Sequence, residues 1–195
     1  MDDSALTPDG WLACARRVPS PNFDTRPAGE VISLLVIHNI SLPPGRYGND
    51  CVERFFCNQL PADEHPYFAG IADMRVSSHF MIRRDGELVQ FVSLLDRAWH
   101  AGRSEFEGRA ECNDYSIGVE MEGQDDENYS AEQYETLVRL TRTLMTLVPN
   151  ITPERIVGHE HIAPGRKTDP GPAFDWQYYL SHLTLMKQSS DGDSA

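Results

Sequence analysis

A run of apolar residues at 31–39 (VISLLVIHN) constrains the fold of this chain more than any other feature. Several of its residues are β-branched, and the run does not alternate between apolar and polar positions. Such a continuous pattern is typical of a strand that lies in the centre of a sheet and is buried on both faces. We therefore expect a sheet with other elements packed on it, and we expect this strand to end before the Pro-Pro-Gly sequence at 43–45.

The rest of the chain predicts both strands and helices. Residues 116–123 (SIGVEMEG) alternate strictly, so they predict a half-buried strand with Glu120 on its polar face. Residues 76–93 predict a hairpin with a tight primed turn at Asp85-Gly86. A capping-box pattern at Ser130-Ala-Glu-Gln133 begins the most regular helical periodicity in the chain. Local patterns also predict three shorter elements, namely a helix at 52–60, a strand at 154–160 and a helix at 174–186.

This mixture of elements indicates an α/β (α+β) fold, with a mixed central β-sheet flanked by helices. The 195 residues suit one domain with a sizeable core, and no internal repeat or Gly/Ser linker divides them. We expect a single domain over residues 1–187, whose Pro-rich first thirty residues wrap its surface. Residues 188–195 are expected to form a disordered C-terminal tail.

The overall charge and the apolar content narrow the possible partners. The formal net charge is −13, which argues against general binding to nucleic acid or to an anionic membrane. No run of 18 or more apolar residues is present, so no transmembrane helix is expected. The first residues lack the pattern of a signal peptide, which points to the cytoplasm, where all four cysteines would be free thiols. A disulfide between Cys51 and Cys57 is the alternative in another compartment.

Two histidines lie at the ends of predicted strands, and an aspartate lies in a loop that prolines stiffen. His38 ends the first apolar run, His159 follows the sequence RIVG, and Asp169 lies in the Pro-flanked sequence TDPGP. Two histidines and a carboxylate with an open fourth position form a recurring catalytic zinc site. Taken singly, each residue has an ordinary alternative, a hydrogen-bonded core histidine or a turn aspartate. His161 competes with His159 for the second position, because both face one side if the segment is extended.

Such a zinc ion lowers the pKa of bound water to about 7 and polarises a carbonyl group. The site then needs a base for the water proton and a cation for the developing oxyanion. Glu120 is the candidate base, since Gly118 beside it leaves room on the polar face of the strand. Lys167 is the candidate cation, because residues two apart in an extended loop point the same way and Asp169 is two residues on. Taken alone, Lys167 would be assigned to the surface.

Six segments of the chain together resemble one family. The likeness covers about residues 11–180, and the segments are LLVIHNISLPPG, HPYFAGI, VSSHFMIRRDGELVQFV, RAWHAG, CNDYSIGVEMEG and GHEHIAPGRKTDPGPAFDW. They resemble the zinc-dependent N-acetylmuramoyl-L-alanine amidases, most closely the AmpD type, which are the cytoplasmic anhydro-muropeptide amidases of peptidoglycan recycling. The resemblance implies the fold that this family shares with peptidoglycan-recognition proteins, a mixed sheet flanked by helices.

Residue by residue, the resemblance implies one Zn²⁺ per chain, and it favours His159 over His161. The implied metal ligands are His38, His159 and Asp169, and the implied catalytic residues are Glu120 and Lys167. The implied substrate-binding residues are Asn39, Tyr67, Arg75, His79, Trp99 and His100. Of these, Arg75 is expected to pair with a peptide carboxylate. The chain departs from the AmpD pattern at Glu111, where a basic residue is common, and Arg109 or Arg103 is the expected substitute.

The reaction that the resemblance implies is hydrolysis of the amide between the lactyl group of (1,6-anhydro-)N-acetylmuramic acid and L-alanine. The implied substrate is a small muropeptide, with no nucleic acid, membrane or obligate protein partner. Three alternatives are weighed against it. They are a non-catalytic muropeptide-binding module of the same fold, an exported amidase acting on intact cell wall, and a regulatory or structural protein without enzymatic activity.

Overall fold

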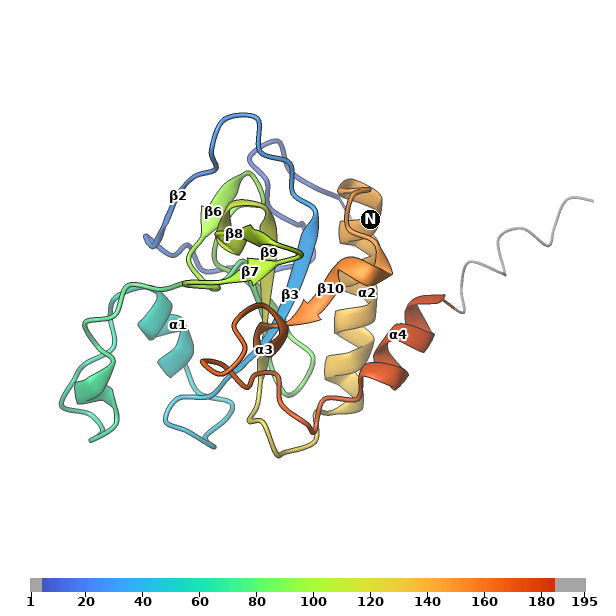
Figure 1. Cartoon of the computed structure of the whole chain (residues 1–195). Coiled ribbons are helices and arrows are strands. Elements are labelled where there is room, and N and C mark those ends of the chain that lie inside the picture. Colours follow the sequence, from blue (N-terminus) through green and yellow to red (C-terminus); the bar gives the residue numbers. More distant parts are fainter. Residues whose placement is uncertain (1–4, 185–195) are drawn as a thin grey trace, which may run out of the picture.

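The computed structural model describes residues 5–184, and Figure 1 shows a central sheet with helices on both sides. The strands of this sheet are β1 (Arg16–Arg17), β3 (Leu34–Ile40), β4 (Phe80–Ile82), β5 (Leu88–Gln90), β9 (Ser116–Glu122) and β10 (Ile156–Gly158). Their order across the sheet is β1-β5-β4-β9-β3-β10. Within it β4 and β5 pair antiparallel, and the other neighbours run parallel. The predicted mixed central sheet is therefore confirmed.

The remaining elements are short ribbons and helices. Two ribbons pair β2 (Phe23–Thr25) with β6 (Asp96–Ala98), and β7 (Glu105–Phe106) with β8 (Arg109–Ala110). The helices are α1 (Cys51–Phe56), α2 (Ala131–Leu147), α3 (His159–Ile162) and α4 (Trp176–Thr184). Single 3₁₀ turns occupy Phe68–Gly70, Cys112–Asp114 and Pro153–Arg155.

The two faces of the sheet are covered by different elements. On one face, α2 and α4 pack over the largest hydrophobic cluster, which includes Ile37 of β3 and Val119 of β9. On the other face there are two smaller clusters, one containing Phe56 of α1 and one containing Ile162 of α3.

The apolar run at 31–39 forms the central strand that its pattern predicted. In β3 the residues from Leu34 to His38 are buried, and the strand lies between β9 and β10. The half-buried character predicted for residues 116–123 is wrong, because all seven residues of β9 are buried. Neighbouring strands flank β9 on both sides, and the ring of His100 covers its polar face at Gly118. An alternating pattern showed two chemically different faces but not that both are covered.

The hairpin at 76–93 is confirmed as β4 and β5, but the primed turn is wrong. A type I′ turn needs positive φ at both central residues. Here Gly86 N–H donates to the carbonyl of Arg83, and the left-handed residue is Gly86 itself, at φ 84°. The loop is therefore a three-residue hairpin connection closed by a glycine.

The structure confirms some of the predicted element boundaries and shifts others. The capping box at Ser130 and Gln133 is present and begins α2. The strand predicted at 154–160 ends earlier, since helix α3 begins at His159. The first thirty residues do more than wrap the surface, because β1 forms an edge of the sheet. The last predicted helix appears as α4, while residues 185–186 and the predicted tail at 188–195 lie outside the described residues.

Two further expectations concern cysteines and membranes. Cys51 begins α1 and Cys57 follows its last residue, and no disulfide joins them. The alternative of a Cys51–Cys57 bridge is therefore not borne out. Within residues 5–184, no helix combines the length and the apolar character that crossing a bilayer requires.

Candidate functional site

The polar residues singled out in the sequence meet at the C-terminal ends of neighbouring parallel strands. His38 of β3 and Glu120 of β9 are register partners. On the other side of β3, β10 ends at Gly158, so His159 enters α3 at the same edge of the sheet. Ligands bind in α/β folds outside the carboxyl ends of such strands. The topology thus brings together residues more than a hundred positions apart.

Three of these side chains form a compact triangle of possible ligand atoms. His38 Nδ1 and His159 Nδ1 lie 3.0 Å apart, and Asp169 Oδ2 lies 3.0 Å from each of them. The side chains are 2%, 3% and 14% exposed, respectively. Among the described residues, these three form the one group of histidine, cysteine and acidic side chains that could hold a metal ion.

The triangle fits a zinc ion in both size and chemistry. Its 3.0 Å sides put each corner about 1.7 Å from the centre, a spacing compatible with the bonds of about 2.0–2.1 Å that zinc makes to nitrogen and oxygen. At most one Nδ1 atom of this triangle can carry a proton without facing a second N–H group, so at least one histidine lone pair faces the lone pairs of the carboxylate. A cation facing three lone pairs removes this conflict.

The outer nitrogen of His159 is bonded so that its Nδ1 presents a lone pair to the triangle, and the outer nitrogen of His38 contacts a second histidine. His159 Nε2 donates to the carbonyl oxygen of Ala101 at 3.1 Å. His38 Nε2 lies 2.9 Å from Nδ1 of His100, and Nε2 of His100 lies 3.0 Å from the hydroxyl of Ser116. The Ala101 carbonyl therefore leaves Nδ1 of His159 as an acceptor, and Nδ1 of His38 is one as well when His38 donates from Nε2 to His100. Such outer partners orient the ligands of a metal.

His100 depends on a glycine for its position. A Cβ at Gly118 would lie 2.5 Å from Cγ of the His100 ring, closer than side-chain atoms approach. The sequence suggested that Gly118 leaves room near Glu120, and the ring of His100 fills that room. The same glycine donates its N–H to Nδ1 of His79, which lies fully buried behind His100.

Glu120 is a buried carboxyl group in the same cavity. It is 7% exposed, and its Oε2 atom has no hydrogen-bond partner among the described residues. Burial, followed by repulsion from Asp169, raises the pKa of Glu120 well above its usual value, and Lys167 partly opposes the shift. A carboxylate with a raised pKa accepts a proton more readily than an ordinary one, as a general base must.

The triangle residues are held in the protonation states that bind a metal. Burial lowers the pKa of His38 to about 4, so this ring is neutral at pH 7. Burial acts to raise the pKa of Asp169, but the interactions with the neighbouring His159 and His38 outweigh it and hold that pKa below its usual range. Neutral imidazole and ionised carboxylate are the ligand forms of these groups.

A cavity of about 220 Å³ lies over these groups. The residues singled out in the sequence that line it are His38, Asn39, Trp99, His100, Glu120, His159, Lys167 and Asp169. A neighbouring groove of about 830 Å³ also includes Asn39, and Tyr67 lies on its wall. The structure thus brings the ligand triangle, Glu120 and Lys167 together at one end of a larger groove.

Three other candidates lie elsewhere. Arg75 lines neither the cavity nor the groove, and its guanidinium donates to the carbonyls of Ala72 and Met74. His79 is fully buried and does not line the cavity. His161 turns away because α3 is helical rather than extended, so its Nδ1 accepts from the N–H of Gly158.

The region around Glu111 is engaged in ion pairs. Glu111 has a left-handed backbone at φ 58°, and its carboxylate lies 3.6 Å from Arg97. Arg109, one of the two expected substitutes for a basic residue there, is paired with Glu30 and stacks on the ring of Tyr115. Neither Arg109 nor Arg103 lines the cavity or the groove.

The apolar wall of the cavity consists of residues that were not among the candidates from the sequence. Phe55 and Phe56 of α1 line it, together with Met74 and Val76. The amphipathic pattern at 52–60 was the available signal, because a short helix after the first core strand has an apolar face that must be covered. Only the tertiary structure shows that this face borders the polar groups.

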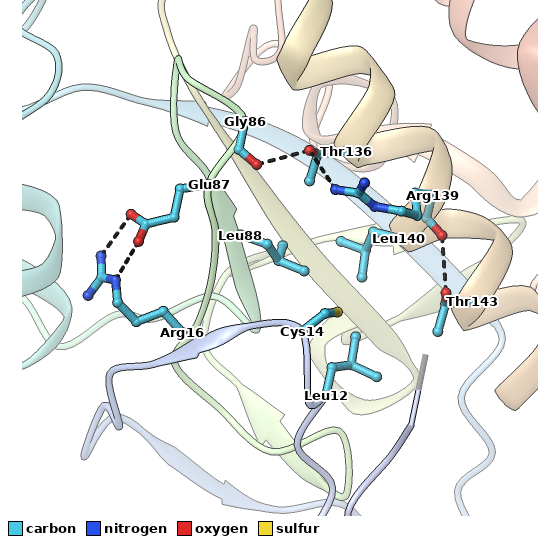
Figure 2. Close-up of a pocket in the computed structure, with 10 residues that line it drawn as sticks. All are labelled: Leu12, Cys14, Arg16, Gly86, Glu87, Leu88, Thr136, Arg139, Leu140 and Thr143. Atoms are coloured by element: carbon cyan, nitrogen blue, oxygen red, sulfur yellow. Dashed lines mark hydrogen bonds and ion pairs between the residues drawn. The ribbon is translucent and has the colours of Figure 1, made fainter. Parts of the chain in front are cut away.

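A second cavity, of about 470 Å³, lies on the α2 side of the sheet and contains none of the candidate site residues. Figure 2 shows its lining, with Leu12, Leu88 and Leu140 around the centre. Arg16 and Glu87 at its edge are ion-paired with each other. Its lining thus combines leucines with charged and threonine side chains, and among these residues there is no arrangement comparable with the triangle.

Fold and site geometry define an α/β protein with a triangle of possible metal ligands and a buried acid beside it. The chain belongs to the N-acetylmuramoyl-L-alanine amidase family, whose sequence model matches residues 28–172. It is 53% identical over 179 residues to the 1,6-anhydro-N-acetylmuramyl-L-alanine amidase AmpD of Citrobacter freundii, covering 92% of this chain and 95% of that protein. AmpD of Escherichia coli is also 53% identical, over 88% of this chain and 93% of that protein.

Solved structures agree with this assignment. The crystal structure of a selenomethionine AmpD derivative is 53% identical, with a TM-score of 0.89 over 92% of this chain and all of that one. AmiD from Escherichia coli, solved with the substrate anhydro-N-acetylmuramic acid-L-Ala-D-gamma-Glu-L-Lys, is 28% identical. Its TM-score is 0.58 over 80% of this chain and 60% of that one. The expected family is confirmed by both sequence and fold.

Proposed function

We propose that this amidase is a zinc enzyme that cleaves the bond between the lactyl group of 1,6-anhydro-N-acetylmuramic acid and L-alanine in small muropeptides. The observation that carries the proposal is the triangle of His38, His159 and Asp169, with Glu120 and Lys167 at the same cavity. The names of the AmpD relatives support the substrate, and so does the substrate bound in the AmiD structure. This substrate implies a role in peptidoglycan recycling in the cytoplasm.

The chain's own residues account for the proton transfers and charge changes. When bound, one Zn²⁺ per chain would supply Lewis acidity, which polarises the lactyl carbonyl and acidifies water. Glu120 takes the proton of the attacking water and then passes it to the leaving nitrogen of L-alanine, a cycle suited to its raised pKa. The Lys167 ammonium group stabilises the negative charge that develops on the carbonyl oxygen.

The substrate-binding assignments divide by position. Trp99, Asn39 and His100 line the inner cavity, so they would contact the part of the substrate next to the scissile bond. Tyr67 is 47% exposed on the wall of the outer groove, where it offers an aromatic face to a sugar or peptide. Arg75 would reach a peptide carboxylate only by leaving its present backbone contacts. His79 is fully buried and does not line the cavity, so any effect of it on the substrate would be indirect.

A turnover assay tests the proposal and separates its alternatives. Purified protein with its zinc content quantified is given anhydro-muramyl tripeptide and, separately, intact peptidoglycan. We expect release of the L-alanine-terminated peptide from the small substrate at a much higher kcat/KM than from polymeric wall. Binding of the muropeptide without any release would identify a recognition module. Faster release from the polymer would identify a cell-wall amidase.

A further inference from the structure

The loop that carries Asp169 is held on both sides of that residue. The carbonyl oxygen of Asp169 accepts a hydrogen bond from the N–H of Glu160 at 3.0 Å, which ties the loop to α3. The next carbonyl, of Pro170, accepts from the hydroxyl of Tyr129 at 2.8 Å and from the side-chain amide of Asn39 at 3.1 Å. A carbonyl oxygen has two lone pairs, so these two donors use its full capacity.

The same loop is packed against backbone on two sides. Gly171 has φ 83°, and a Cβ there would lie 2.3 Å from Cα of Asp125. A Cβ at Gly158 would lie 2.7 Å from Cδ of Pro170, so the proline ring rests on the residue that precedes His159. Contacts this close transmit small displacements, because packed interiors yield little. A shift of Pro170 would therefore reach the Asp169 carboxylate.

The two donors to Pro170 are themselves held in place. Tyr129 is 7% exposed, and its ring packs so tightly on Gly123 that a Cβ there would lie 2.6 Å from it. The amide of Asn39 also donates to the carboxylate of Asp125 at 2.7 Å. Asn39 directly follows His38 in β3, so one side chain connects the strand that carries a histidine to the loop that carries the aspartate.

We propose that Tyr129 and Asn39 are positioning residues, which fix the Asp169 carboxylate against the two histidines by holding the carbonyl of Pro170. This inference rests on the metal centre of the proposed function. It gives Asn39 a role in building the site that is distinct from contact with substrate. It also brings in Tyr129, which lies outside the cavity and in none of the sequence motifs. Loss of groups that orient a metal ligand costs about 10–100-fold in affinity, and we expect about tenfold for Tyr129 because it acts through the backbone.

The test compares two buried tyrosines that differ in their link to Asp169. Tyr129→Phe removes the donor to Pro170 and keeps the ring. Tyr134→Phe is the matched control, since Tyr134 is also 7% exposed and its oxygen accepts one hydrogen bond, from the N–H of Asp175 at 2.7 Å. The zinc Kd of each metal-depleted full-length protein is measured by competition with a chromogenic chelator. Thermal unfolding of the same samples reports their folding.

We expect Tyr129→Phe to raise the zinc Kd about tenfold and Tyr134→Phe to leave it within twofold of wild type. An unchanged Kd in Tyr129→Phe, or an equal rise in both variants, would overturn the proposal. If Tyr129→Phe does not fold, Asn39→Ala carries the test. A raised zinc Kd in that variant supports positioning, whereas a raised KM with an unchanged zinc Kd refutes it for Asn39. Zinc affinity is measured without substrate, so failure of the turnover assay would count against the proposed function alone.

Discussion

Replacing Gly118 by alanine tests how far the proposed metal site depends on the packing of the His100 ring, which contacts the ligand His38. The new Cβ would lie 2.5, 2.7 and 2.8 Å from Cγ, Nδ1 and Cδ2 of the His100 ring. The ring cannot retreat easily, since it bonds to His38 and Ser116 and its edge meets His79, with ring centroids 5.9 Å apart. Either the ring moves and its bond to His38 breaks, or β9 shifts within the sheet.

The loss of stability and the loss of metal affinity each have an expected size. Forcing a methyl group into a packed core costs about 1–3 kcal/mol of unfolding free energy. Loss of the partner that orients His38 weakens metal binding by about 10–100-fold, or about 1.4–2.7 kcal/mol. We therefore expect Gly118→Ala to show both a lower thermal midpoint in the metal-free protein and a weaker zinc Kd by chelator competition.

The control for this prediction is Gly70→Ala. Gly70 lies in an exposed 3₁₀ turn at negative φ, and a Cβ there meets nothing within 4 Å. This variant should match wild type in both measurements. If Gly118→Ala also matched wild type, the ring of His100 would not be confined as described, and the argument that it orients His38 would be refuted.

Three further predictions concern the acid, the lysine and pH. Glu120→Gln should lower kcat by about 10²–10⁴-fold with zinc content unchanged; near-normal turnover in the loaded protein would remove Glu120 as the base. Lys167→Ala should lose activity mainly in kcat, since its charge acts on the transition state, and a change confined to KM would contradict that role. In metal-free protein, the pKa of His38 is lowered by burial from 6.5 to about 4, so the unfolded chain binds more protons between these values. His38 therefore contributes stability above pH 6.5 that is lost as the pH falls towards 4, up to about 3 kcal/mol; urea unfolding across this range should show it, and His38→Gln should flatten the slope.

Local patterns in the sequence were sufficient for two principal elements, the central strand and the long helix α2. The run at 31–39 predicted the central strand because an unbroken apolar pattern is stable only when both faces are covered. The capping box at Ser130 predicted the start of α2 because it satisfies backbone N–H groups through neighbouring side chains. Both patterns involve only neighbouring residues, so they can be recognised without knowledge of the rest of the chain.

Other features were decided by contacts between distant segments. Both faces of β9 are buried because the hydrophobic cluster under α2 covers one face and the His100 ring lies on the other, and the alternating pattern of 116–123 cannot show this. His161 points away from the site because the chain turns into helix α3 after Gly158. The ring of Pro170 packs against Gly158 at this turn. Tyr129 gave no signal at all, since its role depends on the path of a loop forty residues later.

The amino-acid sequence by itself determined which residues can bind a metal and transfer a proton, because that chemistry belongs to the side chains His38, His159, Asp169, Glu120 and Lys167. Only the tertiary structure decided that three of these lie 3.0 Å apart, that the glutamate is buried, and that the Ala101 carbonyl leaves Nδ1 of His159 available. The physical reason is that distance, burial and tautomer depend on strand register and on packing between segments far apart in the chain.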